Sequence, residues 1–366
     1  RLVLHLRDQV RVRMDGADNP DSEFRRSYHK TLVRRVLFII GCAVLCLIVL
    51  AYSITLGTYP ITMAEVYKVI WNFIINMPND ASDQWVVINL RMPRILGAIV
   101  CGFALAVCGT AMQSILKNPL ADPYTMGISS GAGFGAAIAL ILGVELIAGG
   151  GVVVNAFVFA LIPMAVILLM SRIRRATPTM MILCGTSLMY MFNALTQLFM
   201  IVADPDDLSN VYSWMVGTLE DITYGNLPII IAVTVVGSII VQLMANRLNV
   251  MSTGDESART LGVDVDKERL LLLILVTIVA ATVVSFTGVI GFVGLVAPHV
   301  ARIIVGSDNK YLIPAAGTFG SLLMLLADMA SRVLADSNLP VGVITACIGG
   351  PVFILLILRS SKEAWR

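Results

Sequence analysis

The sequence predicts an all-α membrane protein with ten transmembrane helices and with both termini in the cytoplasm. Its 366 residues are 57% hydrophobic and 14% charged, with a mean hydropathy of +0.85, whereas about a quarter of residues are charged in soluble domains. An apolar run of about 20 residues crosses the bilayer as a helix, which satisfies its own backbone hydrogen bonds where water is absent. Such runs cover residues 36–56, 95–115, 125–148, 152–170, 180–203, 227–245, 270–284, 289–305, 312–326 and 341–358.

Positive charge sets the orientation of these spans, because Lys and Arg collect on the cytoplasmic connections of membrane proteins. With the N-terminus inside, all but four of the 26 Lys and Arg residues lie on inner segments. The four on outer segments are Lys68, Arg91, Arg94 and Arg332. The outer connection 204–225 has acidic residues but no Lys or Arg. We therefore expect both termini in the cytoplasm, which requires an even number of spans in the cytoplasmic membrane.

The chain divides into three segments at the ends of the spans. Residues 1–35 form a basic cytoplasmic segment without an evident cleavable signal peptide. Residues 36–358 form the transmembrane domain, and residues 359–366 form a cytoplasmic tail. Basic side chains before the first span are expected to attract anionic lipid headgroups at about 1 kcal/mol each. They are Arg25, Arg26, Lys30, Arg34 and Arg35.

Titratable, catalytic and metal-binding residues are scarce inside the spans, which argues against an ion-driven carrier and against a membrane enzyme. An ion-driven carrier needs titratable groups near mid-membrane, but Glu145, His299 and Asp328 lie near span ends. The sequence contains no phosphate-binding P-loop, and its three histidines are too scattered for a catalytic or metal site. All six cysteines lie inside apolar runs, without disulfide or zinc spacing. Active transport by this chain would therefore draw its energy from another chain.

Small residues are concentrated in the third span, at Gly127, Ser129, Ser130, Gly131, Gly133 and Gly135. Small side chains let membrane helices approach closely, so packing is the favoured interpretation of this pattern. The alternative is a broken helix whose backbone lines a cavity.

Three long motifs carry the functional signal. The first reads RMPRILG at 91–97 and continues as NPLADPYTMGISSG at 118–131. The second is GDESARTLGV at 254–263, and the third is SFTGVIGFVGLVAPHVAR at 285–302, with LAD at 326–328 and LPVGVIT at 339–345. Together they resemble the FecCD-type permease family, the membrane subunits of ATP-driven importers for iron-siderophore, haem and vitamin B12. The resemblance covers nearly the whole chain from the first span to Leu358.

The resemblance implies an architecture and a set of partners. Such permeases have ten transmembrane helices, with helices two to five related to helices seven to ten by an inverted repeat. They pair with a second permease subunit, expected here to be identical, around a central pathway. Two ATP-binding subunits dock on the cytoplasmic face and one substrate-binding protein docks outside. ATP and Mg belong to the partner ATPase, so this chain is expected to bind no cofactor or metal and, with a net charge of +2, no nucleic acid.

The resemblance also assigns roles to outer and inner residues. Arg91, Arg94 and Arg332 would meet acidic residues of the binding protein; the alternative is that they snorkel to lipid phosphates. The inner loop 254–268 reads as a short capped helix or a solvated turn, and the resemblance makes it the coupling helix that sits on the ATPase. Its expected contact residues are Gly254, Asp255, Glu256, Ala258, Arg259, Leu261 and Gly262.

Two further groups of residues match the gate and the pathway. The cytoplasmic gate would comprise Asn118, Leu120, Thr177, Pro178 and Thr179, although the same residue types also serve as ordinary helix caps. The fifth span has polar residues at spacings near three and four, which places them on one face. That face lines either the pathway or a contact between helices. Its residues are Thr186, Tyr190, Asn193 and Gln197.

The sequence therefore predicts the permease subunit of an ATP-driven importer for a metal chelate, with iron-siderophore as the first candidate. Haem and vitamin B12 are alternatives within the same family. An ion-coupled secondary carrier and a membrane enzyme are the alternatives from other classes. The scarcity of titratable residues inside the spans argues against both.

Overall fold

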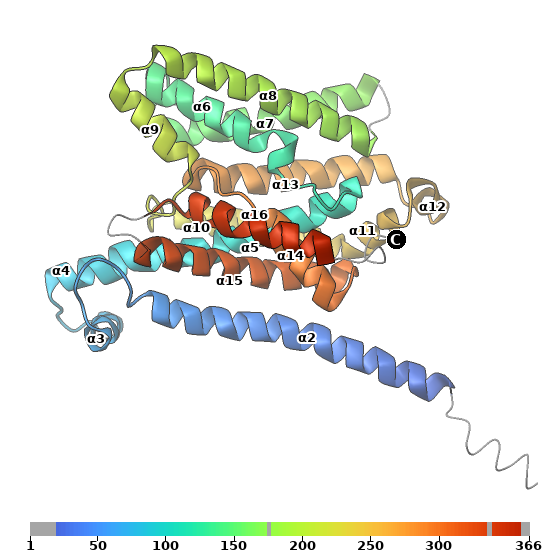
Figure 1. Cartoon of the computed structure of the whole chain (residues 1–366), viewed down its shortest axis with the longest axis horizontal. Coiled ribbons are helices and arrows are strands. Elements are labelled where there is room, and N and C mark those ends of the chain that lie inside the picture. Colours follow the sequence, from blue (N-terminus) through green and yellow to red (C-terminus); the bar gives the residue numbers. More distant parts are fainter. Residues whose placement is uncertain (1–19, 174–176, 335–338, 360–366) are drawn as a thin grey trace, which may run out of the picture.

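The computed structural model describes residues 20–173, 177–334 and 339–359, and within these ranges the secondary structure is entirely helical (Figure 1). Every predicted span coincides with a helix. These helices are α2 (Pro20–Ser53), α5 (Met92–Leu116), α6 (Ile128–Leu142), α7 (Gly151–Ile173), α8 (Pro178–Val202), α10 (Leu227–Leu243), α13 (Val265–Thr287), α14 (Val293–Val305), α15 (Asn309–Val333) and α16 (Val341–Arg359). The connections contain α3 (Met63–Ile74), α4 (Ala81–Gln84), the π-helix η1 (Trp85–Arg91), the 3₁₀ turn η2 (Tyr124–Met126), α9 (Pro205–Met215), α11 (Ala245–Ser252) and α12 (Asp255–Thr260).

The predicted class, an all-α protein with several membrane spans, is confirmed. Among the described residues, six helices are long and apolar enough to cross a membrane, and α10 with α11 adds a seventh span if this pair, bent by 54°, is counted as one. Three shorter apolar helices, α6, α14 and α16, occupy the remaining predicted spans. The total of ten crossings therefore stays a prediction, as does the inverted repeat.

The helices form two groups around α13 (Figure 1). Helices α6, α7 and α8 pack together on one side of α13, while α5 and α15 pack against each other on the other side, with α2 along α15. Gly102 and Gly320 make the α5–α15 contact possible, because a Cβ on Gly102 would lie 2.4 Å from the Gly320 carbonyl oxygen. In α6, a Cβ on Gly131 would lie 2.5 Å from the Phe159 carbonyl oxygen in α7. At Gly131 the small-residue pattern thus serves helix packing.

The helix boundaries differ from the predicted ones where charged residues adjoin apolar runs. Helix α2 begins at Pro20 instead of residue 36, so the basic segment is partly helical, while residues 1–19 and the tail 360–366 lie outside the described ranges. The second span is part of a continuous helical stretch from Ala81 instead of residue 95. The predicted apolar run begins only after Arg94, but the helical stretch reaches back to Ala81 and includes both Arg94 and Arg91. Both arginines are buried in the structure.

Candidate functional site

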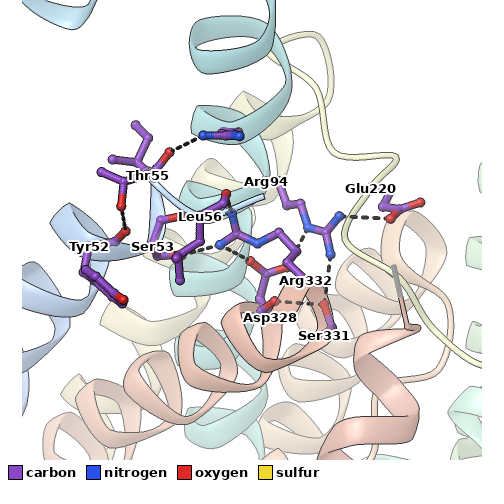
Figure 2. A network of polar contacts seen from close by, with 11 residues as sticks. Tyr52, Ser53, Thr55, Leu56, Arg94, Glu220, Asp328, Ser331 and Arg332 are labelled. Carbon is purple, nitrogen blue, oxygen red and sulfur yellow. Dashed lines mark hydrogen bonds and ion pairs between the residues drawn. The ribbon is translucent and has the colours of Figure 1, made fainter. Parts of the chain in front are cut away.

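Arg94 is the centre of a buried ion-pair network at the end of the bundle that the charge pattern assigns to the outside (Figure 2). Its Nε donates to Asp328 Oδ1 at 2.6 Å, its Nη1 to Glu220 Oε1 at 3.0 Å and its Nη2 to Ser331 Oγ at 3.1 Å. Asp328 has no solvent exposure, and Arg332 pairs with its other oxygen at 3.0 Å. A buried carboxylate requires such partners. The network thereby links α5, α15 and the connection before α10.

Arg91 and Arg332 hold the end of α2 in place. Arg332 Nη1 donates to the carbonyl oxygens of Ser53 and Leu56 at 3.0 and 3.1 Å. Arg91 Nη1 and Nη2 donate to the carbonyl oxygens of Ile54 and Tyr59 at 3.0 and 3.2 Å. Carbonyls at a helix C-terminus lack partners within the helix and attract cations. The two arginines therefore hold the last residue of α2 and the segment that follows it.

The three outer arginines lie side by side in the wall of a small pocket of about 170 Å³, which also includes Tyr59 and Leu90. Arg91, Arg94 and Arg332 are only 6–7% exposed, so they do not form a freely accessible charged patch. Arg94 and Arg332 pair with the carboxylates of Asp328 and the half-exposed Glu220, whereas the hydrogen bonds of Arg91 go to carbonyl oxygens. Within the described part of the chain, this leaves one positive charge in excess. Docking of a binding protein at these arginines stays a prediction.

Asp255 ties the predicted coupling helix α12 to two long helices at the opposite, inner end. Its carboxylate accepts from Lys117 Nζ at 2.5 Å, just after α5, and from Arg269 Nη2 at 2.9 Å, in α13. Arg269 is only 1% exposed. Partial burial alone would raise the pKa of Asp255, but the hydrogen bonds from Lys117 and Arg269 outweigh this effect and hold the pKa below its usual value.

The remaining residues of the coupling loop separate into an inward and an outward group. Ala258 is fully buried and packs with Met251 and Val265, so its expected contact with an ATPase is not supported by this arrangement. The exposed residues of the predicted set are Glu256, Arg259, Leu261 and Gly262. Gly254 and Gly262 bracket the helix with φ values of +130° and +84°, a region that favours glycine. They let the short helix begin and end abruptly.

The predicted gate residues make local capping contacts. Asn118 Oδ1 accepts from the backbone N–H of Leu120 at 2.9 Å, and Thr177 Oγ1 accepts from that of Met180 at 3.3 Å at the start of α8. Pro178 occupies the first turn of α8, where a backbone N–H would have no acceptor within the helix, so the missing N–H of proline costs no hydrogen bond. Thr179 is exposed. No hydrogen bond among the described residues joins the two connections. A gating role stays a prediction.

The polar residues of α8 lie on one side of the helix, which is partly open in the single chain. At about 100° per residue, Thr186, Tyr190, Asn193 and Gln197 fall within an arc of about 60°. Tyr190 is 71% exposed and Gln197 is exposed, while Thr186 and Asn193 are half-buried. A different face, about 110° around the helix axis, packs into the chain through Gly185, Phe192 and Thr196, all of them buried.

The sequence pattern did not predict which residues form ion pairs with the predicted site residues. Asp328 and Glu220 complete the outer network, and Lys117 and Arg269 complete the inner one. Lys117 gave a weak signal, because it is the one cation between residues 95 and 171. The pairing of Arg94 with Asp328 had no sequence signal, because the two residues are 234 positions apart.

Comparison with known proteins identifies the family of the chain. Residues 45–359 match the model of the FecCD transport family. The chain is 34% identical to the hemin transport system permease protein HmuU of Yersinia pestis, covering 88% of this chain and 96% of the relative. It is 37% identical to the cobalamin import system permease protein BtuC of Halobacterium salinarum, covering 75% and 73%. A solved structure of a metal-chelate type ABC transporter in an inward-facing conformation superposes with a TM-score of 0.78 at 30% identity, covering 88% of this chain and 98% of that one. The chain therefore belongs to the FecCD transport family and is a multi-pass membrane permease of the ABC importer type.

Proposed function

We propose that this chain moves a metal chelate across the cytoplasmic membrane by alternating access, driven by ATP hydrolysis on partner subunits. The observation that carries this proposal is the double attachment of α12 through Asp255. An ATPase that displaces the exposed side of α12 would pull on α5 through Lys117 and on α13 through Arg269. Rigid short helices transmit such displacements as rigid-body shifts.

A second copy of the chain would complete the pathway. The polar face of α8 is open in the single chain, and an exposed polar stripe between apolar surfaces is poorly suited to lipid. Pairing two such faces would line a channel with hydroxyl, phenol and amide groups from Thr186, Tyr190, Asn193 and Gln197. We infer a homodimer from this self-complementary geometry.

Iron-siderophore is the cargo we propose first. One relative is named for hemin transport and another for cobalamin import, and the similar solved structure is described as a metal-chelate type transporter. A lining of uncharged hydrogen-bonding groups suits a polar chelate without requiring a particular charge. Haem and cobalamin are the alternatives, and the cargo is decided by the experiment below.

We propose that the binding protein docks at the outer pocket. Its excess positive charge would favour the carboxylate of an acidic side chain, and charge-assisted pairs give register and steering to a partner that docks and leaves. Entry of one carboxylate would balance the cluster of Arg91, Arg94 and Arg332 against Asp328 and Glu220.

Reconstitution tests this function directly. The chain is placed in proteoliposomes with candidate ATPase and binding-protein subunits, and ATP hydrolysis and uptake are measured with ferric siderophore, haem and cobalamin in turn. We expect one chelate to stimulate both activities. Uptake driven by an imposed ion gradient without the ATPase would contradict the proposal.

A further inference from the structure

Helix α3 carries an exposed apolar stripe that the transport function leaves unexplained. Met63, Tyr67, Trp71 and Ile74 are 50%, 45%, 63% and 66% exposed. At about 100° per residue they fall within an arc of about 80° on one side of the helix. Four large apolar side chains on one exposed face are more than scattered surface hydrophobics, and such faces mark an interaction site.

The other two sides of α3 have distinct environments. Val66 and Val69 are buried against the rest of the chain. Glu65, Lys68 and Asn72 are polar and fall within an arc of about 60° on the remaining side. Thr62 and Glu65 form a capping box that fixes where the helix begins. Up to Val69 the helix therefore presents one side to protein, one apolar side outward and one polar side outward, while Phe73 in its last turn is 49% exposed.

The position of α3 identifies what lies beside the apolar stripe. The Tyr67 hydroxyl donates to the Ala51 carbonyl oxygen at 2.6 Å, in the last turn of α2. Only 17% of the apolar window in α2 is buried inside the chain, and its exposed residues include Ile48 and Tyr52. This face of α2 contacts lipid in a spanning helix. Figure 1 shows α3 beside the outer end of α2, at the edge of the bundle. The stripe thus continues the lipid-facing surface of α2.

We propose that α3 is an interfacial helix that lies in the headgroup layer of the outer leaflet. Its apolar stripe would face the acyl chains, and Glu65, Lys68 and Asn72 would face water. Tyr and Trp are enriched at this depth because their rings are apolar and their N–H or O–H groups reach water. An amphipathic helix binds there through its buried apolar area. The helix would anchor the start of α5 and the arginine pocket at a fixed height above the bilayer.

Depth-dependent fluorescence quenching tests this proposal without the ATPase or any cargo. In the full chain, Trp85, Trp214 and Trp365 are replaced by Phe, so that Trp71 is the single tryptophan. The protein is reconstituted into phosphatidylcholine vesicles, and tryptophan is excited selectively over tyrosine. One vesicle set contains lipids brominated near the top of the acyl chains, and iodide serves as the aqueous quencher. The matched control carries Lys68→Trp and Trp71→Phe in the same background, which moves the probe to the polar side of the same helix.

We expect bromolipid to quench Trp71 at least about twofold more than the tryptophan of the control, and iodide to show the reverse order. Equal iodide access at the two positions, without bromolipid quenching of Trp71, would overturn the proposal. So would shielding of Trp71 from iodide only after a binding protein is added, because that result would make the stripe a protein-docking surface.

A second measurement covers the case in which the triple replacement fails to fold. The wild-type chain is labelled with 5-fluorotryptophan, and the ¹⁹F resonance of Trp71 is assigned by its loss in Trp71→Phe. Doxyl lipid should broaden this resonance, and a soluble gadolinium chelate should not. The opposite pattern contradicts the proposal.

Discussion

Arg94 and Asp328 are 234 residues apart in the chain and form an ion pair of 2.6 Å at the outer ends of α5 and α15. Asp328 has no exposure and lies between two guanidinium groups, so its charge has no solvent to replace a lost partner. The helices it joins also meet at Gly102 and Gly320, where no side chain can be added without a clash. Electrostatics and close packing thus hold the same pair of helices together.

Replacing Asp328 by Asn should destabilise the protein strongly. The change leaves the guanidinium groups of Arg94 and Arg332 buried without their shared carboxylate, and breaking a buried pair typically costs about 3–5 kcal/mol. Thermal unfolding in detergent measures the loss. The control is Glu220→Gln, because Glu220 is the half-exposed partner of Arg94 and should contribute no more than about 1 kcal/mol. Equal losses in the two variants would contradict a special role for the buried carboxylate.

Replacing Arg91 by Gln should weaken capture of the binding protein. Within the described ranges Arg91 makes hydrogen bonds to carbonyls only, so it is the arginine that best accounts for the excess charge of the pocket. Losing that charge should slow association and flatten its dependence on salt. Surface plasmon resonance over a salt series measures both. Lys68→Gln, an outer cation away from the pocket, is the control. An unchanged association rate in Arg91→Gln, in protein that folds normally, rules out docking through this charge.

Replacing Asp255 by Asn should uncouple ATP hydrolysis from uptake. The variant loses the ionic contacts of α12 with Lys117 and Arg269, although the outward residues of the helix remain. We expect basal hydrolysis to persist, while chelate-stimulated uptake falls by about tenfold, the equivalent of 1.4 kcal/mol of lost coupling. Lys117→Met should reproduce the effect. Arg247→Gln, which removes the ion pair of Arg247 with Glu268 at the same end, should leave uptake unchanged.

The same contact should be insensitive to mild acid. Because the folded-state pKa of Asp255 lies below its usual value, the contact is fully present above the unfolded pKa of about 3.9 and is lost only as the pH falls through the lower folded value. The rate of coupled uptake, measured between about pH 5 and pH 8, should therefore show no titration step in the wild-type protein that is missing from the Asp255→Asn variant. A pH midpoint of uptake in that range that disappears in the variant would contradict this prediction, because it would mean that the pKa of Asp255 is raised and not lowered in the folded protein.

The helices at the predicted spans were predictable because the length of an apolar run is a local property. Helix α3 was not, because its 12 residues are too few for a span and its apolar character becomes informative only once Val66 is known to be buried. The arginines were singled out from their side of the membrane, but their burial depends on Asp328 and on the carbonyls of α2, which the fold brings from distant positions. Ala258 shows the same limit, because a short helix pattern does not reveal which side faces the chain.

The polar face of α8 gives the most direct test of the pathway. Gln197→Leu and Asn193→Leu each remove hydrogen-bonding groups from this face. Because Gln197 is exposed, folding of the Gln197→Leu variant should be little affected. Losing one hydrogen bond to a moving chelate is worth about 1 kcal/mol, which corresponds to a several-fold fall in uptake. Basal ATP hydrolysis should stay unchanged, because α12 and its contacts are intact. Leu198→Met, a volume-conserving change at an exposed neighbour, is the control. If both polar variants transport as well as the control, the stripe serves a helix contact, and the pathway lies elsewhere in the dimer.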